Sequence, residues 1–150
     1  AAPGGTGKST CMRRLPKGWK ALCDDEALIV RDREGRYHVH PFPTWTDYIW
    51  QRAENRWDVQ YSVPLQALFF LEQADVDDVS AIGPGETAML AYQASIQVCN
   101  KYIPRLDQPA RNRFVRQIFD NACDLAQNIP GYRLKATLDG HFWENMERVI

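Results

Sequence analysis

The stretch APGGTGKS at residues 2–9 constrains the fold more than any other part of the chain. It matches the phosphate-loop pattern G-x-x-x-x-G-K-[ST], with alanine in place of the first glycine. Glycines let backbone N–H groups curl around an anion without Cβ clashes. The pattern also places a helix directly after the loop, with the positive end of that helix facing the anion. The stretch therefore predicts phosphate binding, and the competing interpretation is a glycine-rich terminus without a ligand.

Two side chains of this loop have a specific role in such a site. Lys8 can reach the β- and γ-phosphates of a nucleotide as a point charge. The Ser9 hydroxyl can ligate a Mg²⁺ ion that bridges those phosphates. We expect ATP to contact Pro3, Gly4, Gly5, Thr6, Gly7, Lys8, Ser9 and Thr10.

A phosphate loop also needs a strand in front of it, because that strand fixes the loop at the edge of a sheet. Only Ala1 precedes the motif. We therefore expect the strand to come from residues outside this chain, which would make the chain a fragment of a longer protein.

An acidic pair, Asp24 and Asp25, follows the apolar stretch 21–23. A strand that ends in acid beside a phosphate loop commonly supplies a second contact to Mg²⁺. Two neighbouring carboxylates repel each other, which raises the pKa of one of them and suits it to accept a proton from a substrate hydroxyl. The alternative is a solvated turn between strands.

The rest of the chain alternates between helical and strand patterns. The patterns predict helices over 9–15, 86–100, 108–128 and 141–150, and strands over 27–31, 37–40, 65–71 and 132–137. Gly35 between the first two strands predicts a β-hairpin. The fold class that follows is α/β, with a mixed sheet flanked by helices.

Composition narrows the class of protein further. The chain has 150 residues, a net charge of −1 and 45% hydrophobic residues, which suits one domain over residues 1–150. The near-zero charge argues against a nucleic-acid binder, and no apolar run reaches the roughly 18 residues of a membrane span. The cysteines favour a reducing, cytoplasmic compartment, because they lack the spacing of zinc ligands or redox pairs. They are Cys11, Cys23, Cys99 and Cys123.

The loop and the acidic pair together resemble one group of phosphate-loop kinases. GTGKST at residues 5–10, followed by DDE at 24–26, is similar to the bacterial HPr kinase/phosphorylases, which share a fold with the phosphoenolpyruvate carboxykinases. HPFPTW at 40–45, PLQALFFLEQ at 64–73 and PGYRL at 130–134 resemble HPr-kinase-related proteins encoded beside enzymes that modify ribosomal peptides, including the SynChlorMet cassette protein.

This resemblance implies a carboxykinase-like fold and phosphorylation, dependent on ATP and Mg²⁺, of a serine hydroxyl on a small protein or peptide. It also implies that Asp24 is the general base and that Asp25 holds Mg²⁺ or tunes its neighbour, although the two roles can be exchanged. A homo-oligomer is compatible with it. No clear copy of the glycine-rich phosphorylase motif is present, which makes the reverse reaction doubtful.

Two other functions stay open at this point. One is a nucleotide-binding scaffold in a peptide-modifying complex, and the other is a small-molecule kinase or carboxykinase-like enzyme. The acidic pair argues against the scaffold, because a protein that only binds ATP needs no base.

Several other polar or aromatic residues are expected to be structural. His38 and His40 lack an obvious third metal ligand. Core or interface packing is the expected role of Trp45, Trp50 and Trp57. Solvated helix faces are expected for Arg13, Arg14, Arg111, Arg113 and Arg116.

Overall fold

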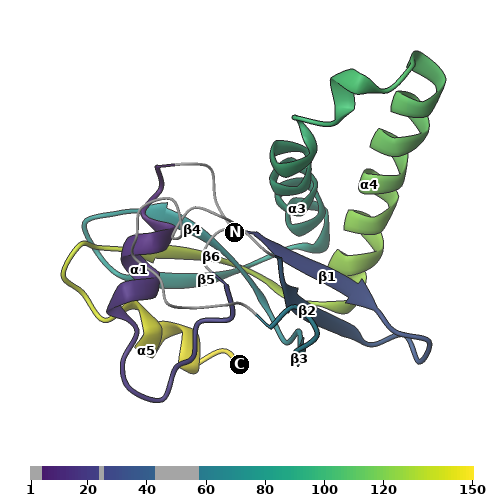
Figure 1. Cartoon of the computed structure of the whole chain (residues 1–150). Coiled ribbons are helices and arrows are strands. Elements are labelled where there is room, and N and C mark those ends of the chain that lie inside the picture. The colour runs from purple at the N-terminus through teal and green to yellow at the C-terminus, as the bar shows by residue number, and fades with distance from the viewer. Residues whose placement is uncertain (1–4, 24–25, 43–57) are drawn as a thin grey trace. The chain divides into compact units, whose positions relative to one another are not determined.

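The computed structural model describes residues 5–23, 26–42 and 58–150 (Figure 1). The chain divides into two compact units, one of residues 7–65 and one of residues 66–150 together with residues 1–6. Both units contain helices and strands, so the chain belongs to the mixed α/β class that the sequence predicts.

The unit of residues 7–65 contains a short helix and a small antiparallel sheet. Its helix is α1 (Lys8–Arg14), and its strands are β1 (Ala27–Arg31), β2 (Tyr37–Pro41) and β3 (Val63–Pro64). The strand order is β1-β2-β3, and Val39 at the centre of β2 lies opposite Ile29 and Val63. The helix predicted over 9–15 and the predicted β-hairpin are both confirmed.

The hairpin turn is organised around the Asp32 carboxylate. Its Oδ1 accepts the backbone N–H groups of Glu34 at 2.9 Å and Arg36 at 2.8 Å, and its Oδ2 contacts Arg36 Nε at 3.0 Å and His38 Nε2 at 3.1 Å. Gly35 closes the turn at φ 85°, a conformation that other residues rarely adopt. The backbone N–H of Arg36 is the main cause that lowers the pKa of Asp32 from 3.8 to about 2, and the side chains of Arg36 and His38 add to it.

This lowered pKa makes the hairpin sensitive to acid. Because the folded state holds Asp32 ionised more tightly than the unfolded chain does, its stabilising effect is complete above pH 3.8 and is lost as the pH falls through about 2. Asp32→Asn is expected to remove the pH dependence of the hairpin's stability between pH 4 and 2. The amide resonances of Gly35 and Arg36 should therefore be lost in acid in the unmodified chain but not in the variant. An NMR titration that places the Asp32 carboxyl near pH 4 would contradict the prediction.

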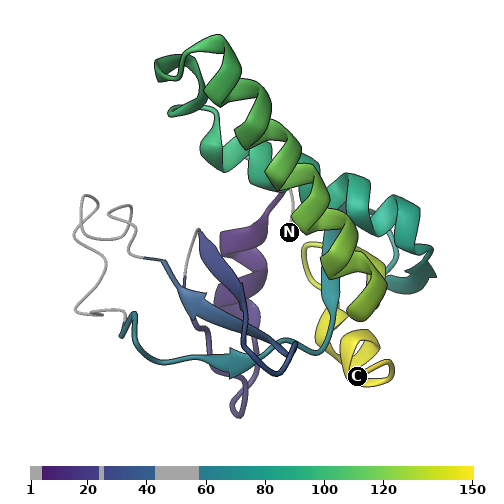
Figure 2. The same ribbon diagram turned by 90° about the vertical axis from the view of Figure 1, so that its right-hand side faces the viewer.

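The unit of residues 66–150 contains a mixed sheet and most of the described core (Figure 2). Its elements are β4 (Leu68–Gln73), β5 (Asp78–Ile82), α3 (Pro84–Cys99), the 3₁₀ turn η1 (Ile103–Arg105), α4 (Gln108–Asn128), β6 (Gly131–Ala136) and α5 (Phe142–Glu147). The strand order is β4-β6-β5, so β6 is the central strand, parallel to β4 and antiparallel to β5.

Helices α3 and α5 pack on opposite faces of this sheet. Successive residues of β6 point to alternate faces. Gly131 lies against Thr87 of α3, whereas the hydroxyl of the next residue, Tyr132, donates to the carbonyl of Val149, just after α5. Among the described residues, the buried hydrophobic side chains of this unit are Phe70, Ala88, Ala91, Ala122, Leu125, Ala126, Ile129, Leu134, Ala136 and Phe142.

Helices α3 and α4 form a hairpin that extends away from the sheet (Figures 1 and 2). The buried residues of α3 lie in its first half and those of α4 in its second half, where the helices meet the sheet. Phe114, in the far half of α4, is 37% exposed although it belongs to the apolar stripe of that helix. The apolar surface of the far half is thus only partly covered by this unit.

The ends of these helices follow the sequence signals. The Asp107 carboxylate caps α4 by accepting the backbone N–H of Ala110 at 2.8 Å, and Pro130 follows its last residues. Pro84 occupies the first turn of α3, where its missing N–H costs no helical hydrogen bond.

No helix among the described residues is both long enough and apolar enough to cross a membrane.

The structure corrects three sequence predictions. The hairpin β1–β2 and the mixed sheet belong to two separate three-stranded sheets instead of one. The strand predicted over 65–71 begins at Leu68, because Val63 and Pro64 already pair with β2 in the other unit. The stretch 21–23, which precedes the acidic pair, lies in no strand.

Candidate functional site: the glycine-rich loop

The described part of the candidate phosphate loop is Gly5–Thr10, which leads directly into helix α1. Gly5 has φ 79°, and Gly7 has φ 93° and ψ 12°. Both glycines therefore lie in the left-handed region, which costs other residues about 1–2 kcal/mol. A Cβ atom at Gly5 would meet no heavy atom within 4 Å, so conformation rather than space requires glycine there.

Helix α1 begins where the phosphate-loop pattern places it. Gly7 is its N-cap, and the Gly7 carbonyl accepts the backbone N–H of Cys11 at 2.9 Å. Lys8 is the first helical residue and is half-buried, while Ser9 and Thr10 are exposed. The N-cap makes no side-chain hydrogen bond and the first turn holds no acidic residue, so no carboxylate of that turn offsets the positive end of the helix.

Besides Lys8, helix α1 carries two basic residues, which lie at its other end. Arg13 and Arg14 occupy the last turn, where a positive charge interacts favourably with the helix dipole. Arg13 is exposed, as the sequence predicts, whereas Arg14 is half-buried.

Four of the predicted site residues lie outside the described residues. They are Pro3, Gly4, Asp24 and Asp25. Trp45, Trp50 and Trp57 lie outside them as well. The geometry of the loop therefore concerns Gly5, Thr6, Gly7, Lys8, Ser9 and Thr10.

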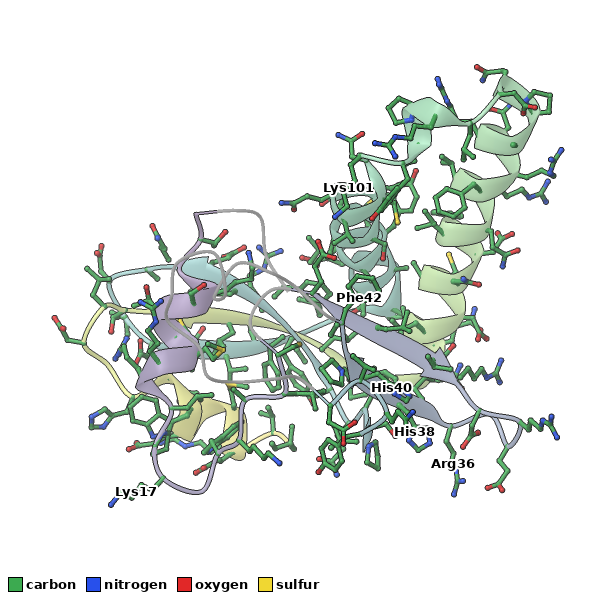
Figure 3. The ribbon with its side chains drawn as sticks, viewed as in Figure 1. Lys17, Arg36, His38, His40, Phe42 and Lys101 are labelled. Carbon is green, nitrogen blue, oxygen red and sulfur yellow. The ribbon has the colours of Figure 1, made fainter. Side chains whose placement is uncertain are left out.

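The two histidines of β2, which Figure 3 labels, have separate partners. His38 contacts Asp32, and His40 Nδ1 lies 3.3 Å from the carbonyl oxygen of Val59. Within residues 5–23, 26–42 and 58–150, no group of three or more His, Cys, Asp or Glu side chains could hold a metal ion. Ser9 is thus the one predicted Mg²⁺ ligand that the structure describes.

Sequence reasoning missed a charged cluster in the other unit. Arg133 on the central strand β6 donates to Glu72 of β4 and to Glu86 in the first turn of α3. The hydrogen bond to Glu86, followed by the charge of Glu72, raises the pKa of Arg133 above its usual value. Glu72 and Glu86 lie 61 and 47 residues before Arg133 in the chain, so no local pattern predicts this cluster.

The described residues of the loop thus combine left-handed glycines, a lysine at the start of a helix and exposed hydroxyls. Backbone N–H groups in this arrangement can surround an anion, the ammonium group can neutralise it, and a hydroxyl can supply an oxygen ligand to a hard cation. These are chemical capabilities of the residues present, and a phosphate group with a bound divalent cation fits all three.

Comparison with known proteins places this mixed α/β chain with its glycine-rich loop in a family. The family model described as SynChlorMet cassette protein ScmC matches residues 1–150, and the chain belongs to that family. A search of curated proteins and a search of solved structures found no match.

Proposed function

We propose that this chain binds ATP through residues 3–10 and transfers its γ-phosphoryl group to a serine hydroxyl on a small protein or peptide. The observation that carries the proposal is the conformation of GTGKS at residues 5–9: Gly5 and Gly7, at φ 79° and 93°, come directly before a helix that starts at Lys8. A merely flexible glycine-rich terminus requires neither the left-handed glycines nor the helix start at the lysine.

Binding and charge stabilisation follow from the residues of the loop. Backbone N–H groups around Gly5 and Gly7 would donate to the phosphate oxygens, and Lys8 would neutralise the charge that develops between the β- and γ-phosphates. Ser9 would hold Mg²⁺, which shields the phosphate oxygens when bound. Positioning and electrostatics supply most of the catalysis in phosphoryl transfer.

The acceptor side of the reaction rests on the acidic pair. By the resemblance to HPr kinases, Asp24 takes the proton of the serine hydroxyl while the serine oxygen forms its bond to the γ-phosphorus and ADP leaves. Asp25 holds Mg²⁺ or tunes Asp24, and the two roles can be exchanged. The kinship with HPr kinases, a carboxykinase-like fold and a cytoplasmic location belong to the same proposal.

Transfer of labelled phosphate tests this function. The complete protein is incubated with Mg²⁺ and ATP labelled at the γ-phosphate, together with serine-containing peptides and a panel of small hydroxyl compounds. Label on a peptide serine is the expected result. Label on a small molecule would identify a small-molecule kinase, nucleotide-dependent peptide binding without label would identify a scaffold, and failure to bind ATP would overturn all three.

A further inference from the structure

The chain carries two oppositely charged surfaces at opposite ends of one unit. From residue 66 to 100 it holds five acidic residues and no Lys or Arg, whereas from 101 to 116 it holds five basic residues and one acidic residue. The net charge of the chain is only −1, but its acidic and basic residues are unevenly distributed along these two segments.

The first surface, the acidic end, is formed by two turns that lie at the same end of the strands of the mixed sheet. The β4–β5 turn and the turn after β6 are joined by Asp77, whose Oδ1 accepts the backbone N–H of Thr137 at 2.6 Å. Two apolar side chains protrude there, Val76 at 72% and Leu138 at 76% exposure. The exposed carboxylates around them are those of Asp75, Asp78 and Asp139.

The second surface, the basic end, lies at the far end of the α3–α4 hairpin, where Figure 3 labels Lys101. Its apolar side chains are Tyr102, 49% exposed, and Phe114, 37% exposed. Its exposed cationic side chains are Lys101, Arg105, Arg113 and Arg116. Asp107 caps the start of α4, and the carboxylate of Asp120 lies 3.8 Å from Arg116 Nε one turn further along the helix.

The topology keeps the two ends apart within one copy. The β4–β5 turn follows Gln73, which pairs with Ala136 at the last residue of β6. Helix α3 follows Ile82, which pairs with Gly131 at the first residue of β6, so the turn and the helix leave the sheet at opposite ends of its strands. The hairpin then extends away from the sheet (Figure 1). The acidic end of one copy can therefore reach the basic end only of another copy.

We propose that a second copy of this chain docks its acidic end on the basic end of the first. Each end combines exposed apolar side chains with a rim in which one charge predominates: Lys135 of β6 lies opposite Asp78 at the acidic end, and Asp120 pairs with Arg116 near the basic end. Complementary rims of this kind steer association and fix its orientation. The two contacting surfaces are different, so the association is head-to-tail and builds a ring or a chain of copies. This association does not require the proposed kinase activity.

Sedimentation velocity of the complete protein at about 50 mM and about 500 mM salt tests the proposal, because the higher salt screens exposed charges within a few ångströms. The weight-average mass is expected to rise above the monomer value at low salt and to return toward it at high salt. A protein that stays monomeric at every concentration, or whose association ignores salt, overturns the proposal.

Charge-reversed variants make the test specific. Asp75→Lys/Asp78→Lys and Arg113→Glu/Arg116→Glu are each expected to weaken self-association about tenfold or more, because like charges then face each other. An equimolar mixture of the two variants should associate again, since each then offers a surface complementary to the other. Arg33→Glu, the same change at an exposed position in the other unit, should leave association unaltered, and circular dichroism should show every variant folded. A mixture that stays monomeric contradicts the head-to-tail arrangement.

Discussion

Replacing Lys8 by alanine is expected to abolish phosphotransfer while leaving helix α1 intact. The change removes the ammonium group that the proposed mechanism places on the β- and γ-phosphates, and loss of one such electrostatic contact costs about 10²–10³-fold or more in rate. Alanine is the strongest helix former, so the helix that begins at this residue keeps its local stability. Initial rates with labelled ATP, at saturating nucleotide, measure the effect.

A matched control is available in the same unit. Lys17, labelled in Figure 3, is exposed in the loop after α1, and Lys17→Ala removes the same charge outside the motif. Its rate should stay close to that of the unmodified protein. Full turnover by a folded Lys8→Ala variant would remove the phosphate loop from the mechanism, whereas a loss of its helical signal would show that the lysine is needed for folding.

Replacing Gly131 by alanine is expected to give the largest loss of stability. Gly131 begins the central strand β6, and a Cβ atom there would collide with the side chain of Thr87, which is 1% exposed. Thr87 cannot turn away freely, because its hydroxyl donates to the Gly83 carbonyl at 3.0 Å. Over-packing of this kind costs about 1–3 kcal/mol, measured as a lower urea midpoint in equilibrium unfolding.

Gly85 provides the control for that substitution. It lies in the first turn of α3, and a Cβ atom there would meet nothing within 4 Å. Gly85→Ala is therefore expected to be neutral or to stabilise the protein by up to about 1 kcal/mol. Adding Thr87→Ala should restore part of the stability lost by Gly131→Ala. Equal midpoints for the two glycine variants would contradict the close packing of α3 on β6.

Elements with strong local signals could be predicted from the sequence. Helix α4 spans the predicted residues 108–128, because its apolar repeat lies between a proline near its start and Pro130. Strand β1 spans the predicted 27–31, because an apolar run precedes a turn with Gly35. In each case the residues that define the element are neighbours in the chain.

Features that depend on distant residues could not be predicted. Strand β5 has the sequence DVSAI, which lacks an apolar run, and it exists because β6 pairs with it. The contacts of Arg133 with Glu72 and Glu86 depend on the same strand order. In the candidate site, the glycine conformations follow from local sequence, whereas Asp24 and Asp25 lie outside the described residues.

The central place of β6 has a consequence for how this unit is made. Strands β4 and β5 are synthesised before β6, but in the sheet they pair with β6 and not with each other. Leu68 pairs with Gly131, which is 63 residues later in the chain, so the parallel pairing of β4 and β6 cannot begin until Gly131 has been synthesised. Closure of so long a loop is slow, and until it occurs the edges of both early strands remain open to other chains. We therefore expect this sheet to form during translation only after β6 has emerged.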